Sequence, residues 1–274
     1  MPHTLNLTPH PAPVAPLAAV CVAERCEWSW DRCFMALCIL SDVTLKMLQR
    51  SLRTEISMTI QSTQLRIDIV SDVMCPWCVI GFRQLAIALE ATGVDHEIHW
   101  HPFELNPNMP TAGQDMREHL IEKYGTTTEQ SNANRANMTA RGEELGFTFR
   151  FEDGFRMHNT FNTHQLLHWA NEQGRMDDLK QALFTAHFTN GRNLSDDRIL
   201  AEIAKEIGLD RAEAIKVLDD QRFAAKVREE QMFWTQQGIS GVPAVVFDRK
   251  HLVTGAQGVD NYQSIINQLQ EIRA

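Results

Sequence analysis

The chain has 274 residues, 43% of them hydrophobic and 22% charged, which is typical of a globular protein of one or two domains. Its formal net charge of −9 argues against nucleic acid or an anionic membrane as the main partner, because both attract basic surfaces. The sequence shows neither an apolar run of the roughly 20 residues that span a membrane nor a secretory signal pattern, so we expect a cytoplasmic protein.

Residues 1–57 differ in pattern from the remainder of the chain. Four of the six cysteines stand in this segment, at positions whose spacing fits no zinc pattern: Cys21, Cys26, Cys33 and Cys38. We expect the segment to be an N-terminal extension that the folded domain does not need, either poorly ordered or the product of a start codon assigned too early.

A regular pattern begins at residue 64. The apolar run Leu65–Val70 predicts a β-strand, and a helical pattern extends from Cys75 to Ala91. Residues 96–101 alternate as in a second strand, and a proline-marked loop follows over residues 102–110. Two strands joined by a helix predict a right-handed parallel crossover.

A long helical tract follows the loop. It extends from about residue 115 to about residue 237 and is interrupted by glycines that mark the ends of separate helices. Beyond it, residues 242–247 and 251–254 predict two strands joined by a short turn. Apolar residues at helical spacing predict a last helix over residues 259–272.

The order of these elements predicts an α/β protein with a thioredoxin fold. Its sheet would be formed by two halves of a thioredoxin-like domain, residues 64–110 and 238–274. An all-helical domain, residues 111–237, would be inserted between the halves, with its last helix packing back on the sheet.

The sequence Cys75-Pro76-Trp77-Cys78 stands between the first strand and the first helix. At a helix start, unpaired backbone N–H groups and the positive end of the helix dipole stabilise a thiolate, so we expect the pKa of Cys75 to lie below the roughly 8.5 of a free cysteine. Pro76 suits the first helical turn because its missing N–H would have no helical partner there. A thiolate is the species that attacks disulfides, and the pair therefore predicts a redox-active dithiol.

Zinc binding is the alternative for two cysteines at this spacing. A structural zinc site usually needs four ligands, and no cysteine follows Cys78. His164 and His168 stand four residues apart on one predicted helix face, but no third ligand accompanies them. We therefore expect no bound metal, and the redox interpretation is favoured.

Five segments of the chain together carry a resemblance to a known family. They are Ser71–Cys78, Pro102–Pro107, Asn159-Thr160 with His164, Gly238–Pro243 and Gly255–Gln257. With them the chain resembles the DsbA family of thioredoxin-fold oxidoreductases, and more closely its cytoplasmic FrnE-like branch, which is related to 2-hydroxychromene-2-carboxylate isomerases. The resemblance covers about residues 64 to 272.

The resemblance implies a role for Val242 and Pro243. In this family the proline that matches Pro243 follows a cis peptide bond and lies against the active disulfide. The backbone of Val242 would then stand beside Cys75, where an extended substrate strand can form hydrogen bonds with it. Considered without the family pattern, Pro243 would instead be interpreted as the start of an edge strand.

Two departures from the family pattern concern the tuning of the cysteines. Thioredoxin-like strands often hold a buried acidic residue six positions before the first cysteine, and Ile69 stands there. Asp72 is the nearest carboxylate, and it either helps to move protons or caps the turn before the helix. Trp77 replaces the histidine of periplasmic DsbA, and the loss of that cationic neighbour predicts a milder oxidant. We expect Trp77 to be partly exposed as a substrate contact.

The leading hypothesis is a thiol–disulfide oxidoreductase in which Cys75 is the nucleophile and Cys78 resolves the mixed disulfide. Its partners would be proteins or small molecules with disulfides or thiols; glutathione is a candidate co-substrate, and no other cofactor is expected. The alternative is a glutathione-dependent isomerase or kappa-class transferase, although such proteins usually carry serine near the position of Cys75 and need no resolving cysteine. A third hypothesis is chaperone-like binding between sheet and helices. Both a monomer and a homodimer fit the sequence.

Overall fold

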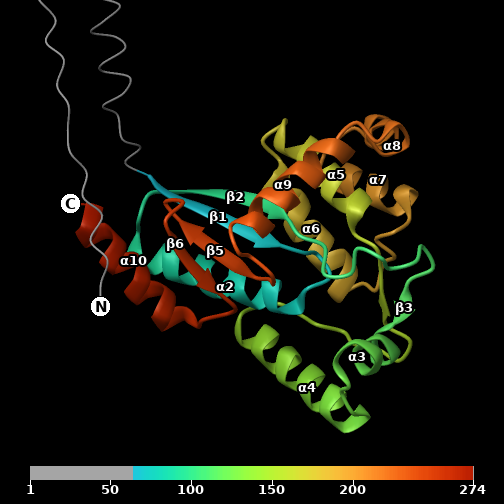
Figure 1. Ribbon diagram of the computed structural model, residues 1–274, viewed down its shortest axis with the longest axis horizontal. Helices are drawn as coiled ribbons and strands as arrows, with labels where there is room; N and C mark the ends of the chain where they lie inside the picture. The colour runs from blue at the N-terminus through green and yellow to red at the C-terminus, as the bar shows by residue number, and fades with distance from the viewer. Residues whose placement is uncertain (1–63, 274) are drawn as a thin grey trace, which may run out of the picture. The chain divides into compact units, whose positions relative to one another are not determined.

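The computed structural model describes residues 64–273 (Figure 1). The predicted N-terminal extension, residues 1–57 with its four cysteines, lies outside the described residues. A four-stranded sheet with the strand order β2-β1-β5-β6 is the main sheet of the described part. Its strands are β1 (Leu65–Ser71), β2 (His96–Pro102), β5 (Ala244–Phe247) and β6 (His251–Thr254).

β1 lies inside the sheet, with a neighbour on each edge. It pairs in parallel with β2, where Ile67 stands opposite Ile98, and antiparallel with β5, where Ile69 stands opposite Val245. Its residues are nearly all buried. A strand covered on both faces is typically a near-continuous apolar run, and this is the pattern that Leu65–Val70 shows. The parallel pairing of the first two predicted strands is therefore present.

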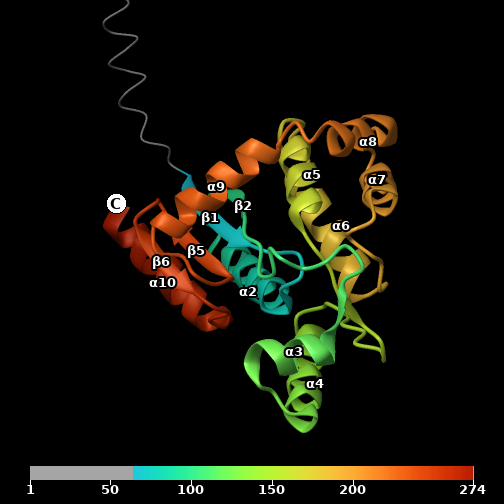
Figure 2. The same cartoon turned by 45° about the vertical axis from the view of Figure 1, so that its right-hand side comes forward.

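Helices cover both faces of this sheet. α2 (Pro76–Thr92) and α10 (Val259–Arg273) lie side by side on one face (Figure 1). α9 (Ala224–Gln236) lies on the other face, where Trp234 packs with Val70 (Figure 2). The start of α2, which carries the two cysteines, therefore lies between the sheet and the segments that follow β2.

Between β2 and β5 the described chain is mostly helical. Besides α9, the helices here are α3 (Met116–Tyr124), α4 (Thr128–Glu144), α5 (Phe161–Asn171), α6 (Met176–Phe188), α7 (Asp197–Glu206) and α8 (Arg211–Asp220). No helix within residues 64–273 combines the length and the apolar character needed to cross a membrane.

The sequence predicts only helices in this part, but the structure also contains a second, two-stranded sheet. β3 (Gln114–Asp115) pairs antiparallel with β4 (Arg156–Met157). Two residues per strand are too few to show an alternating pattern. The pairing is reinforced by the guanidinium of Arg156, which donates hydrogen bonds to the carbonyl oxygens of Ala112 (3.0 Å) and Gly113 (2.9 Å).

β5 is shorter than the strand predicted over residues 242–247. It begins at Ala244, after Pro243, which has no backbone N–H to donate to a neighbouring strand. The carbonyl oxygen of Pro243 accepts a hydrogen bond from the N–H of Gly255 at 2.8 Å. Residues 242 and 243 therefore form a loop at the end of the sheet rather than part of it.

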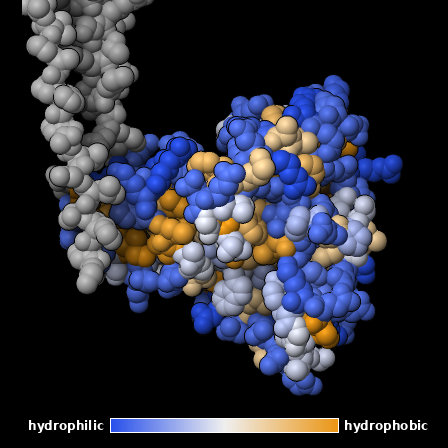
Figure 3. All heavy atoms as spheres, in the orientation of Figure 1, coloured by the Kyte–Doolittle hydropathy of each residue, from blue (hydrophilic) through white to orange (hydrophobic). Residues whose placement is uncertain are grey.

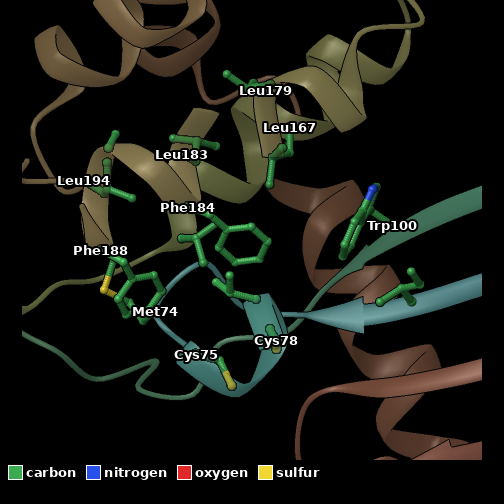
Figure 4. Close-up of a cluster of buried hydrophobic side chains, with 14 of the residues drawn as sticks. Met74, Cys75, Cys78, Trp100, Leu167, Leu179, Leu183, Phe184, Phe188 and Leu194 are labelled. Carbon is green, nitrogen blue, oxygen red and sulfur yellow. The ribbon is translucent and has the colours of Figure 1, made fainter. Parts of the chain in front are cut away.

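The apolar core joins the sheet to the inserted helices. Figure 4 shows the ring of Phe184, from α6, between that helix and the start of α2, with Phe188 next to Met74. Met74 and Cys78 are at most 1% exposed. The two cysteines thus belong to this core.

Candidate active site

Cys75 and Cys78 lie at the start of α2, after the turn that follows β1. Cys75 immediately precedes the helix, with φ −95° and ψ 109°, and Pro76 occupies the first helical position. The N–H of Cys75 donates to the carbonyl oxygen of Asp72 (3.2 Å), and the N–H of Cys78 donates to that of Cys75 (3.0 Å). Both thiols are free and buried, and Cys75 is the less enclosed of the two, at 4% exposure against 1%.

The two thiols titrate as a pair. The hydrogen bond between them, burial and the charge of Cys78 raise the pKa of Cys75 well above its ordinary value. Burial also raises the pKa of Cys78, but the Cys75 thiol and the Ser71 hydroxyl outweigh burial, so that the pKa of Cys78 is lowered. The pair therefore loses its first proton readily and its second with difficulty. The low pKa expected for Cys75 is corrected accordingly: the neighbouring Cys78 and burial raise the pKa of Cys75, and the pKa that is lowered is that of Cys78.

The loop before β5 lies against Cys75. The Val242–Pro243 peptide bond is cis, and the carbonyl oxygen of Val242 accepts a hydrogen bond from the Cys75 thiol at an Sγ···O distance of 3.6 Å. Pro243 packs on α2 at Gly81, where an added Cβ atom would lie only 3.2 Å from the proline Cγ. Glycine at position 81 allows the loop to approach the helix closely. The structure thus brings Val242 and Pro243 to the dithiol.

Trp77 lies on the surface beside the cysteines. Its side chain is 38% exposed, and its ring centre lies 6.0 Å from the guanidinium carbon of Arg141 on α4. Leu252 of β6 is also exposed, and Figure 3 shows hydrophobic surface on this face of the molecule. A large aromatic ring is therefore presented to solvent next to two buried sulfurs.

Asp72 is buried in the turn between β1 and α2. Its Oδ1 accepts a hydrogen bond from the N–H of Met74 (3.2 Å), and its Oδ2 accepts one from the N–H of Leu105 (2.7 Å). Burial raises the pKa of this carboxyl, but His164 and the two backbone donors outweigh burial and hold the pKa below its ordinary value. Asp72 therefore caps the turn as an ion. The pKa of Cys75 is raised mainly by Cys78 and by burial, and the negative charge of Asp72 raises it further.

The side chain of His164 forms a hydrogen bond with the backbone. Its Nε2 donates a hydrogen bond to the carbonyl oxygen of Phe103 (2.9 Å) and lies 3.7 Å from Oδ1 of Asp72. His168 faces α9, with its Nε2 4.0 Å from Oε1 of Glu230. Within residues 64–273, no group of three or more His, Cys, Asp or Glu side chains is arranged to hold a metal ion.

A second buried carboxylate, Asp68 of β1, points to the opposite face of the sheet. Its oxygens accept hydrogen bonds from Arg66 (2.9 and 2.7 Å), and Nε2 of His101 lies 2.8 Å from Oδ1. Successive side chains of a strand point to opposite faces, so Asp68 faces α9 while Ile69 faces α2. Asp68 is therefore not a substitute for the missing acidic residue near the cysteines.

Lys180 of α6 is a residue of this region that the sequence analysis missed. It is 1% exposed, and its Nζ lies 5.2 Å from the ring centre of Trp100 and 5.1 Å from that of Phe184. Burial lowers the pKa of the amine to about 8, although the nearby Cys78 and Asp72 favour its charged form. The signal that could have revealed it is its spacing of four residues from Phe184, which places both on one helix face.

The arrangement of sheet, helices and dithiol is that of a known family. The model of the DSBA-like thioredoxin domain matches residues 66–267, which is most of the chain. The chain belongs to this family. The family and the thioredoxin fold predicted from the sequence are thereby confirmed, and membership places the chain among DsbA-like thiol–disulfide oxidoreductases.

Individual relatives agree with this membership. A probable DsbA oxidoreductase from Streptomyces coelicolor is 34% identical, with a TM-score of 0.70 over 75% of this chain and 89% of that one. Protein YwbO of Bacillus subtilis, which is uncharacterised, is 26% identical over 206 residues, or 75% of this chain and 97% of YwbO. The cytosolic disulfide reductase DsbM of Pseudomonas aeruginosa shares the fold at 17% identity and a TM-score of 0.54, over 76% of this chain and 99% of DsbM.

Proposed function

We propose that this DsbA-like protein catalyses thiol–disulfide exchange through its Cys-Pro-Trp-Cys sequence, with Cys75 as the nucleophile and Cys78 as the resolving thiol. The observation that carries the proposal is a pair of interacting thiols at the start of α2, with the carbonyl oxygen of Val242 3.6 Å from Sγ of Cys75. Cys75 is bordered by the exposed Trp77 and by the loop before β5. A substrate disulfide therefore reaches this sulfur first.

The exchange proceeds in two steps. The Cys75 thiolate attacks one sulfur of a substrate disulfide, a bond forms between the two sulfurs, and the other substrate sulfur leaves as a thiolate. Deprotonated Cys78 then attacks Sγ of Cys75, which releases the remaining substrate sulfur as a thiolate and closes the Cys75–Cys78 disulfide. Two electrons pass from the dithiol to the substrate. Two molecules of a thiol such as glutathione return the two electrons and leave as one disulfide, and the reverse sequence oxidises a substrate dithiol.

The surroundings of Cys75 favour an extended polypeptide as substrate. In the reduced protein the Cys75 thiol donates to the carbonyl oxygen of Val242. In a mixed disulfide Cys75 has no proton to donate, and a substrate backbone N–H takes its place on that oxygen. The exposed ring of Trp77 supplies apolar contact beside it. The proposed partners are thus disulfide- or thiol-containing proteins, with glutathione as a small co-substrate.

We place this reaction in the cytoplasm. The fold shared with the cytosolic disulfide reductase DsbM and the FrnE-like sequence features support that location. A cytosolic glutathione pool would supply electrons for a reductase or an isomerase.

Reduction of insulin with glutathione as the electron source tests the proposal. We expect Cys75→Ser to abolish turnover. A matched variant with serine in place of Cys21, Cys26, Cys33 and Cys38 should retain it. Equal turnover in Cys75→Ser would contradict the proposal and point to a binding function.

Cys78→Ser separates exchange from glutathione-dependent isomerisation. An oxidoreductase that needs a resolving thiol loses catalytic turnover in this variant. An isomerase that uses the thiol of bound glutathione would keep its turnover, because it needs no second cysteine. Full retention of catalytic turnover in Cys78→Ser would therefore favour the glutathione-dependent isomerase.

A further inference from the structure

Glu104 is a buried carboxylate in the loop after β2 that the exchange steps above do not use. Its side chain is 3% exposed. Its Oε1 accepts hydrogen bonds from two side chains of α9, Arg228 and Gln231, the second at 3.0 Å. Its Oε2 is enclosed and has no hydrogen-bond partner among the described residues. A buried charge that is only partly paired is a poor source of stability, because its loss of hydration offsets the attraction.

Arg228 is held in place for its contact with Glu104. Its guanidinium carbon lies 4.0 Å from the ring centre of Phe161, the first residue of α5, and its Nη1 also donates to Oε1 of Gln231 (2.9 Å). Arg228 and Gln231 stand three positions apart on α9 and therefore lie on one side of that helix. Within residues 64–273, Arg228 is the one cation that forms an ion pair with Glu104. The helix thus presents two ordered donors to the carboxylate.

The residue after Glu104 is bound to the turn that carries the dithiol. The backbone N–H of Leu105 donates to Oδ2 of Asp72 (2.7 Å). The carbonyl oxygen of Asp72 in turn accepts a hydrogen bond from the N–H of Cys75 (3.2 Å). A continuous series of contacts therefore leads from α9, through Glu104 and its neighbour, to the backbone of Cys75.

α9 also reaches the dithiol from the other side. The helix is followed by the loop that contains Val242, whose carbonyl oxygen lies 3.6 Å from Sγ of Cys75. Val242 and Phe103 both pack against the apolar cluster that contains Trp234 of α9. Phe103 directly precedes Glu104 in the sequence. One helix therefore contacts both segments that border Cys75.

We propose that Glu104 is a positioning residue for the exchange. By binding two side chains of α9 it fixes the loop after β2, and the fixed loop holds the N–H of Leu105 on Asp72. The turn before Cys75 and the charge beside it then stay in place while the sulfur exchanges partners. The inference rests on the function proposed above, in which Cys75 is the nucleophile.

Loss of the contact with α9 should change Cys75 through Asp72. With Leu105 less firmly held, the carboxylate of Asp72 loses part of the hydrogen bonding that compensates its charge. Cys78 and burial are the main causes of the raised pKa of Cys75, and the charge of Asp72 raises it further. A smaller fraction of Cys75 is then ionised, and the thiol reacts more slowly with an alkylating reagent.

Labelling of the reduced full-length protein with iodoacetamide at pH 7, resolved by peptide mass, measures the rate at Cys75. We expect Glu104→Leu, which fills similar space without a charge, to slow the labelling about threefold, which corresponds to a rise of about 0.5 in the pKa of the thiol. Glu104→Gln keeps an acceptor oxygen for the donors of α9 and should restore a rate close to that of the wild type. Glu229→Leu is the matched control, because Glu229 is exposed on α9.

A double variant with Asp72→Asn tests the route of the effect. If Glu104 acts through the charge of Asp72, Glu104→Leu should not slow labelling in the Asp72→Asn protein. Equal slowing in both backgrounds, or no slowing in the wild-type background, would overturn the proposal. If Glu104→Leu does not fold, Arg228→Met removes the same ion pair and is measured in its place.

A separate measurement distinguishes this inference from the function on which it rests. Failure of the wild-type protein to reduce insulin would overturn the proposed function. The labelling rates need no turnover, so they would still decide whether Glu104 positions Cys75.

Discussion

The thiol of Cys75 donates a hydrogen bond to the carbonyl oxygen of Val242, which lies 167 positions further along the chain. In the exchange proposed above, the proton on sulfur and a substrate N–H would compete for the same oxygen. Formation of a mixed disulfide would remove that proton, so that the covalent step and the docking of the substrate backbone would favour each other. Once Cys78 displaced the substrate, the covalent tie would be lost and the substrate would be held by backbone contacts alone.

Replacement of the resolving thiol should trap substrates. In Cys78→Ser we expect mixed disulfides to accumulate on Cys75, because serine does not break the bond between Cys75 and the substrate sulfur. Non-reducing electrophoresis followed by peptide mass spectrometry measures the trapped species. Cys75→Ser is the matched control and should trap far less, since Cys78 is 1% exposed. Equal trapping at Cys78 would contradict the assignment of the nucleophile.

Asp72 should stabilise the fold by accepting hydrogen bonds from two backbone N–H groups. Asp72→Ala leaves the N–H groups of Met74 and Leu105 without their acceptor, and we expect a loss of roughly 2–4 kcal/mol in the free energy of unfolding. Asp72→Asn keeps one acceptor oxygen and should cost less. Urea unfolding measures both changes. If Asp72→Ala unfolds with wild-type stability, the turn is not held by this carboxylate.

The same variants test the electrostatic effect of Asp72 on the dithiol. Its negative charge contributes, after the hydrogen bond with Cys78 and burial, to the raised pKa of Cys75. Asp72→Asn should therefore speed alkylation of Cys75 near neutral pH, because a larger fraction of this thiol ionises. Iodoacetamide labelling resolved by peptide mass gives the rate. A slower rate than in the wild-type protein would contradict this.

Stability in acid should depend on Asp68. Burial raises its pKa, but hydrogen bonds from His101 and Arg66 hold the pKa well below the usual range. A carboxyl with a lower pKa in the folded state contributes stability that is present above its unfolded pKa of about 3.9 and lost as the pH falls toward the folded value. The destabilisation of Asp68→Asn should thus be largest near neutral pH and shrink below about pH 4. A pH-independent difference in urea unfolding would contradict this.

His101, the partner of Asp68, should contribute stability with the opposite pH dependence. Burial lowers its pKa, but Asp68 and Glu230 outweigh burial and the pKa is raised. A histidine with a raised folded pKa contributes stability that is complete below its unfolded pKa of about 6.5 and lost as the pH rises through the folded value. The destabilisation of His101→Gln should therefore decrease at alkaline pH. The same unfolding series measures it.

Gly142 should tolerate no larger residue. An added Cβ would lie 2.5 Å from Cδ2 of Phe149 and 2.7 Å from the carbonyl oxygen of Phe147. We expect Gly142→Ala to cost roughly 1–3 kcal/mol although alanine is the better helix former. Gly241→Ala is the control, since no atom lies within 4 Å of its added Cβ and the change should stay within about 0.5 kcal/mol. Equal melting temperatures for the two variants would contradict the packing of Phe149 on α4.

The elements around the dithiol could be predicted because their signals are local. The strand Leu65–Val70, the cysteines and the helix behind them follow one another within about 30 residues, and each has its own periodicity. The position of Val242 beside Cys75 has no local signal in the sequence, and its prediction rests on the family resemblance. In the structure Sγ of Cys75 lies 3.6 Å from the carbonyl oxygen of Val242.

Lys180 could not be predicted in the same way. A lysine on a helix is usually solvated, and its burial here depends on how α6 packs on Trp100 of β2, about 80 residues earlier in the chain. The raised pKa of Cys75 is likewise a property of two enclosed sulfurs rather than of the spacing between them. Tertiary packing decides both: the spacing of Lys180 and Phe184 places them on one helix face but does not show that this face is buried.

Because the inserted helices separate β2 from β5 in the sequence, the main sheet is completed late during synthesis. β1 can pair with β2 once residue 102 has been made, whereas its other neighbour, β5, begins at Ala244. At about 5–20 residues per second, translation leaves one edge of β1 open for roughly 7 to 28 seconds. Throughout that interval Cys75 and Cys78 lack the loop that lies against them in the finished protein. During its own synthesis, a protein proposed to rearrange the disulfides of others therefore exposes two thiols that other disulfides can attack.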